Sequence, residues 1–66
     1  MNLIVNGEKV EHGGDGTVPA LFAELGAMPE HTALTVNGEL VFSKDWGKFK
    51  LKDGDTVEVL TFVGGG

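Results

Sequence analysis

Apolar and polar residues alternate in short runs along most of this chain, a pattern typical of half-buried β-strands. Two pairs of such runs are each interrupted by an Asn-Gly dipeptide, which favours a type I′ hairpin turn because both turn positions need a positive φ. The predicted strands span residues 1–6 and 8–12, 33–36 and 39–42, and 56–63, with turns at Asn6-Gly7 and Asn37-Gly38. Each turn lies in the tetrapeptide Val-Asn-Gly-Glu. We interpret the repeat as the same type of hairpin turn formed twice by the same local sequence.

The stretch between the two hairpins has a helical period instead. Its apolar residues recur at i, i+3, i+4 and i+7 and so form one stripe, made of Val18, Leu21, Phe22 and Leu25. Thr17 is a suitable N-cap, Pro19 is tolerated in the first turn, and Gly26 can supply a left-handed C-cap. The order of elements predicts an α+β fold in which one helix covers one face of a mixed sheet of four to five strands.

Composition limits the classes of protein to consider. The chain has 66 residues, no cysteine, and ten acidic residues against five lysines. The length indicates one domain, and the core must hold without disulfides. A net charge of −5 argues against nucleic-acid binding. No apolar run approaches a membrane span, and the N-terminus lacks the features of a signal peptide, so we expect a cytoplasmic protein.

The side chains form no catalytic constellation in the sequence. His12 and His31 lack the local spacing of a metal pair, and neither Thr17 nor Ser43 has an adjacent base. The "HGGDG" stretch lacks the lysine of a phosphate loop. The protein is therefore expected to be no enzyme, and to have no metal and no bound cofactor of its own.

The alternation in the last strand suggests a docking face. If Val57 and Val59 lie under the helix, then Leu60 and Phe62 project from the open face of the sheet, which Ile4 of the first strand shares. Exposed apolar groups on that face predict a protein-binding site.

The glycines Gly64, Gly65 and Gly66 predict a second functional element. Without side chains they form a slender, flexible tail that can enter a narrow channel. The α-carboxylate of Gly66 is ionised at neutral pH and can attack the α-phosphate of a nucleotide to form an acyl-adenylate.

These features together resemble a known family. The stretches "LIVNGE", "TVPALFAELG", "LTVNGELV" and "LKDGDTVEVLTFVGGG" are similar to ThiS-type sulfur carriers of thiamin biosynthesis, in the ubiquitin-like β-grasp group that also contains MoaD-type carriers. The resemblance implies a β-grasp domain over residues 1–63 and a glycine tail over residues 64–66.

The resemblance also implies a chemistry and a set of partners. A ThiF-like, E1-type enzyme would use ATP and magnesium to adenylate Gly66, the residue that bears the sulfur, with Gly65 as the penultimate glycine. A sulfur donor, such as a cysteine desulfurase carrying a persulfide, would convert the terminus to a thiocarboxylate for thiazole synthase. Phe62 and Val63 would lie in the segment that partners bind. Gly64 is a third glycine, which precedes the Gly-Gly pair typical of the family.

Three alternatives remain open from the sequence. The same terminal chemistry serves MoaD-like carriers for molybdopterin or cysteine synthesis. A β-grasp module that binds a protein through Ile4, Leu60 and Phe62 would need no active tail. An unrelated structural domain followed by a linker remnant is the third.

Overall fold

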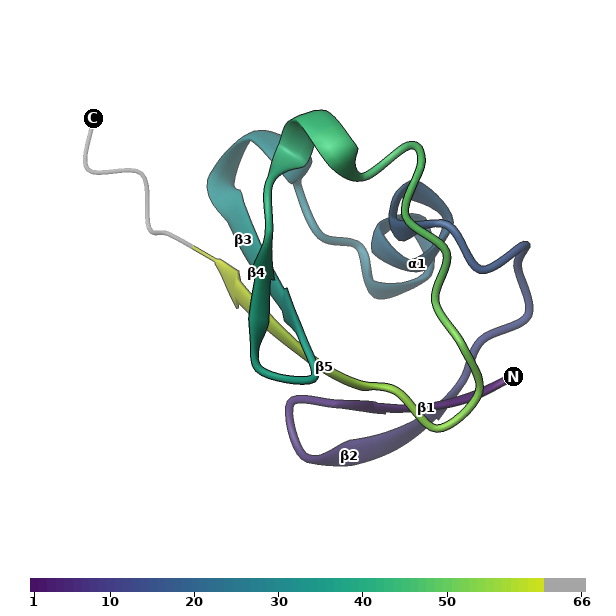
Figure 1. Cartoon of the computed structure of the whole chain (residues 1–66). Coiled ribbons are helices and arrows are strands. Elements are labelled where there is room, and N and C mark those ends of the chain that lie inside the picture. The colour runs from purple at the N-terminus through teal and green to yellow at the C-terminus, as the bar shows by residue number, and fades with distance from the viewer. Residues whose placement is uncertain (62–66) are drawn as a thin grey trace.

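Five strands form one mixed sheet with a single α-helix across one face in the computed structural model, which describes residues 1–61 (Figure 1). The strands are β1 (Asn2–Val5), β2 (Glu8–Glu11), β3 (Thr32–Val36), β4 (Glu39–Val41) and β5 (Thr56–Thr61), and the helix is α1 (Val18–Leu25). Short 3₁₀ turns occupy Pro29–His31 and Ser43–Asp45. The predicted α+β arrangement is confirmed.

Strand β5 lies at the centre of the sheet. The strand order is β2-β1-β5-β3-β4, with β5 parallel to β1 and antiparallel to β3. Each hairpin therefore contributes one strand beside β5 and one outer strand. The parallel pairing requires a crossover connection between β1 and β5, and α1 lies within that connection. Within residues 1–61, no helix has the length and apolar character needed to cross a membrane.

Both Asn-Gly turns adopt the backbone that their sequence predicts. Asn6 and Asn37 have φ of 50° and 52°, and the glycines that follow have φ of 83° and 85°. Asparagine tolerates this left-handed region and glycine enters it at no steric cost, so the dipeptide fixes the hairpin registers.

Helix α1 begins and ends at the predicted residues. The Thr17 hydroxyl accepts a hydrogen bond from Ala20 N–H, and Gly26, at φ 71°, donates its N–H to the Phe22 carbonyl. The helix therefore has a side-chain cap at its start and a left-handed cap at its end.

Replacement of Thr17 by alanine should lower the free energy of unfolding by about 1 kcal/mol, because the Ala20 N–H loses its acceptor. Thr17→Ser keeps the hydroxyl and should lose much less. Urea unfolding of both variants measures the difference, and equal losses would show that the hydroxyl does not cap the helix.

The core lies between α1 and the sheet. Phe22 of α1 meets Trp46 edge to face, with ring centroids 4.8 Å apart, and the Trp46 indole N–H donates to the Val41 carbonyl at 2.9 Å. Trp46 and Leu51 are buried and Phe49 packs partly against them. The irregular segment before β5 therefore closes one side of the core.

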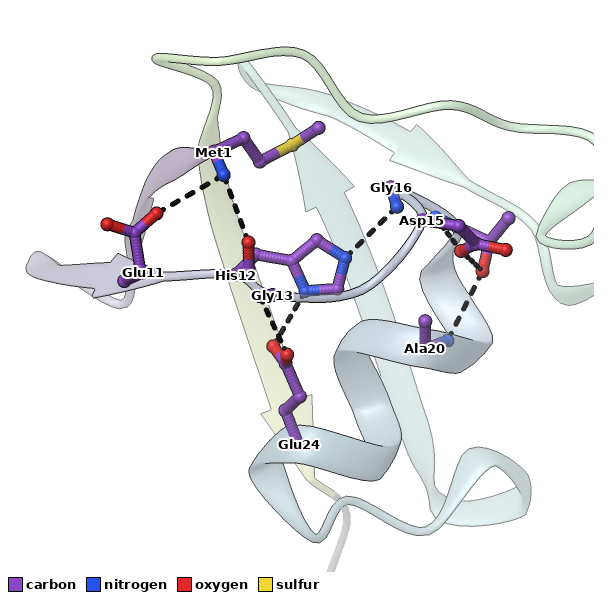
Figure 2. A network of polar contacts seen from close by, with 9 residues as sticks. Met1, Glu11, His12, Gly13, Asp15, Gly16, Ala20 and Glu24 are labelled. Atoms are coloured by element: carbon purple, nitrogen blue, oxygen red, sulfur yellow. Dashed lines mark hydrogen bonds and ion pairs between the residues drawn. The ribbon is translucent and has the colours of Figure 1, made fainter.

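A buried histidine fastens the loop before α1 to the helix. The Gly16 N–H donates to His12 Nε2 at 3.1 Å, so the ring proton sits on Nδ1, which donates to Glu24 Oε1 at 2.6 Å (Figure 2). Glu24 Oε2 also accepts from Gly13 N–H at 2.9 Å. A side chain at Gly14 would have no room, because its Cβ would lie 2.8 Å from the imidazole. No pattern in the sequence predicts this burial of His12.

This network makes part of the stability depend on pH. Its hydrogen bonds, first from His12 and then from Gly13, hold the pKa of Glu24 below its ordinary value of 4.5. A carboxyl with a lower pKa in the folded state contributes stability above its unfolded pKa, and that contribution is lost as the pH falls through the folded pKa.

Stability should therefore decline as the pH falls from above 4.5, the ordinary pKa of this carboxyl, through the lower pKa that Glu24 has in the folded protein. Glu24→Gln should reduce stability at pH 7 and flatten this decline, as measured by urea unfolding across the range. Some slope will remain, because the hydrogen bonds from Thr17 also lower the pKa of Asp15. Equal slopes in the variant and the wild-type protein would contradict the role of Glu24.

Candidate functional site

The face of the sheet opposite α1 carries an exposed apolar patch. Leu40, Phe42 and Leu60 are 54%, 59% and 57% exposed. Leu40 and Leu60 alternate with the buried Val41 and with Val59, so they point away from the helix. Phe42 follows Val41 in an extended conformation and continues the same alternation.

The strand register brings these side chains together. Ala33 pairs with Leu60, and the pairing of Leu34 with Val41 directs Phe42 toward the other side of Ala33. Because neighbouring strands lie about 4.8 Å apart, Phe42 and Leu60 are about 10 Å apart with the small Ala33 between them. We call Ala33, Leu40, Phe42 and Leu60 the open-face patch.

The sequence-predicted face overlaps this patch only in part. Leu60 lies in it. Ile4 is half-buried and pairs with Thr56 at the opposite end of β5, with Glu58 between that position and Leu60. Leu40 and Phe42 were not predicted as site residues, although the alternation in "ELVF" carried the signal. The sequence does not show that β4 pairs with β3, and only this pairing in the fold brings Leu40 and Phe42 close to Leu60.

The predicted tail residues Phe62, Val63, Gly64, Gly65 and Gly66 lie outside the described residues. The described chain leads to them from Thr61, which pairs with Thr32. That position is next to the Ala33–Leu60 pair, so the open-face patch and the start of the tail segment lie at the same end of β5.

The titratable side chains of residues 1–61 show no converging group of three that would suit a metal ion. His12 uses both ring nitrogens in the network described above. Four of the five lysines lie between residues 44 and 52. In the described part of the chain, none of these four lies within ion-pair distance of a carboxylate. The described residues therefore present an exposed apolar patch next to Thr61, the residue from which the tail segment starts.

Comparison with known proteins agrees with this geometry. A model of the ThiS family matches residues 2–66. The chain belongs to the ThiS family. The mixed five-stranded sheet with one helix is the β-grasp fold of that family.

Two solved structures are similar to this ThiS-family chain over its full length. The crystal structure of the thiamine biosynthesis protein ThiS from Geobacter metallireducens is 38% identical, with a TM-score of 0.81 and all of both chains covered. The solution structure of a thiamine biosynthesis protein from the same organism is 38% identical, with a TM-score of 0.78 and 88% of that chain covered.

A curated relative places a similar sequence inside a larger protein. The thiazole synthase of Paramagnetospirillum magneticum is 36% identical over 66 residues, which is all of this chain. The chain spans only 20% of the length of that protein.

Proposed function

We propose that this ThiS-family protein is a sulfur carrier of thiamin biosynthesis, on which partner enzymes act at the Gly66 carboxylate. The single observation that carries the proposal is the family match, which extends through Gly66. The position of the open-face patch supports it, because a partner that docks there also meets the start of the tail segment. The five residues beyond Thr61 have a reach of at most about 18 Å.

The reaction proposed for the terminus has two steps. A Gly66 carboxylate oxygen attacks the α-phosphorus of ATP on a ThiF-like enzyme, with magnesium, and pyrophosphate leaves. Sulfide then attacks the acyl carbon and AMP leaves, so that a thiocarboxylate remains. Where the donor is the persulfide of a cysteine desulfurase, its outer sulfur attacks instead and gives an acyl disulfide, and a thiol reductant cleaves the S–S bond to release the thiocarboxylate. The ATP and magnesium belong to the partner, and this chain contributes its carboxylate and its docking face.

A thiazole synthase is the proposed acceptor of the sulfur. A protein of that name contains a stretch similar to the whole of this chain. Such a combination within one protein favours a functional link between the two parts. The similarity favours the thiazole route over the MoaD-like routes to molybdopterin or cysteine.

Mass spectrometry of the intact protein tests the proposal. Incubation with ATP, magnesium, sulfide and a ThiF-type enzyme should add about 16 Da, because sulfur replaces one oxygen of the ionised terminus. The enzyme must be shown active on its own carrier in parallel. An unchanged mass would contradict the carrier function and favour a β-grasp module that only binds a protein through the open-face patch.

A further inference from the structure

Asn6 and Asn37 occupy the same place in the two Val-Asn-Gly-Glu turns, and both side chains bind β5. Asn37 Oδ1 accepts from Thr56 N–H at 3.0 Å, and Asn37 Nδ2 donates to Asp55 Oδ1 at 3.0 Å. Asn6 Oδ1 accepts from Val59 N–H at 2.8 Å, and Asn6 Nδ2 donates to the Val59 carbonyl at 3.3 Å. One turn therefore holds the start of β5, and the other holds a point near its end.

The Asn6 amide takes the place of a peptide group of β1. The last main-chain bond between the two strands runs from Asn6 N–H to the Val57 carbonyl, at 2.9 Å. In a regular parallel ladder, a main-chain carbonyl of β1 would accept the next N–H of β5, that of Val59. The chain turns away at Asn6, and its side-chain oxygen accepts that N–H instead. The side chain extends the pairing after the main chain has left.

Beyond Asn6, the β1 side of β5 is open. A hollow of about 330 Å³ lies there, lined among others by Leu25, Ala27, Val59 and Thr61. Strand β3 still pairs with the other side of β5 as far as Thr61. Within residues 1–61, Asn6 is thus the last group that forms a hydrogen bond to β5 from the β1 side. The residue that it binds, Val59, lies two residues before Thr61.

We propose that Asn6 is a positioning residue for the charging of Gly66, by which we mean the adenylation of its carboxylate and the conversion to a thiocarboxylate. By fixing Val59, it sets the direction of β5 at Thr61, the last described residue before the tail segment. A carboxylate must meet the nucleotide in a narrow range of geometries, and a misplacement of about 1 Å can cost about 100-fold in rate. Asn37 also accepts a main-chain N–H of β5, but it does so at the far end of the strand, at Thr56, and has no such role. This inference rests on the proposed function.

The twin turns supply a matched pair of variants. Asn6→Gly and Asn37→Gly each keep a residue that accepts the positive φ, and each removes two side-chain bonds. Asn6→Gly loses both bonds to Val59, and Asn37→Gly loses one to Thr56 of β5 and one to the Asp55 side chain. Amide hydrogen exchange reports the local effect, at Val59 for the first variant and at Thr56 for the second. Both amides should exchange faster in their own variant.

The kinetics of charging by a ThiF-type enzyme, measured for both variants, then distinguish an effect on the position of the terminus from an effect on stability. Asn6→Gly should lower kcat about tenfold. Its KM should be unchanged, because the open-face patch is intact. Asn37→Gly should leave both constants unchanged. Asn6→Asp keeps an acceptor for the Val59 N–H and should fall between Asn6→Gly and wild type; it also carries the test if Asn6→Gly does not fold.

The outcomes distinguish this inference from the function on which it rests. Equal losses of kcat in Asn6→Gly and Asn37→Gly would overturn the positioning role, and so would faster exchange at Val59 with unchanged kcat. A wild-type protein that gains no sulfur would overturn the proposed function itself, and the positioning role with it.

Discussion

A variant with one alanine added after Gly66 should gain no sulfur when it is incubated with ATP, magnesium, sulfide and a ThiF-type enzyme. The added residue moves the carboxylate by up to about 3.6 Å and gives the last residue a side chain. Both changes act at the reacting group, where small displacements have large effects on rate. Intact mass should remain that of the uncharged variant. Deletion of Gly66 and Gly66→Ala should have the same consequence.

The fold provides the control for this prediction. None of these changes touches the core of residues 1–61, so melting curves should match the wild-type protein. A longer extension that a protease removes after Gly66 should block charging until it is cleaved and restore charging afterwards. Full charging of the extended protein would contradict the carrier mechanism.

The second large effect should follow from a charge in the open-face patch. Leu60 is 57% exposed beside Ala33 and next to the tail segment, which makes it the best-placed anchor for a partner. Loss of a well-packed apolar anchor typically costs about 2 kcal/mol or more in binding, which corresponds to about 30-fold in affinity. Leu60→Asp should weaken binding to the ThiF-type enzyme by at least this factor, as measured by titration calorimetry.

Met28→Asp is the matched control for Leu60→Asp. Met28 is 55% exposed, and it lies in the loop after α1 rather than on the open face of the sheet. The two substitutions change the net charge equally, so a difference between them reports the position of the residue. Equal weakening by both would indicate a general effect of charge and would count against the patch. Phe42→Asp should behave like Leu60→Asp, because Ala33 alone separates the two residues across the sheet.

Local structure in this protein was largely determined by the sequence. The Asn-Gly dipeptides specify two tight turns because few residues tolerate φ > 0. The stripe that includes Val18, Leu21 and Phe22, with its caps at Thr17 and Gly26, specifies one helix and the face that it buries. The chemistry proposed for Gly66 also follows from the sequence, because it needs a free carboxylate and no side chain.

The neighbours of each strand were decided only by the tertiary structure. Alternation assigns Leu40, Phe42 and Leu60 to one face of their strands, but it does not say that β3 lies between β4 and β5. Ile4 has the same alternation and comes to lie at the opposite end of β5. A patch made from three strands depends on pairings between residues far apart in the chain, and local propensity does not encode these pairings.

Buried polar contacts were likewise settled by the tertiary structure. His12 has no sequence pattern that predicts burial, and its partners Gly16 and Glu24 come together only when α1 packs on the sheet. Asn6 and Asn37 are identical in local sequence, yet only Asn6 lies near the end of β5 that leads to the tail segment. The sequence alone thus determined the elements and suggested the chemistry that we propose for Gly66. Packing decided which side chains lie together at the end of β5 that leads to the tail segment, because contacts across the sheet form only once all five strands are in place.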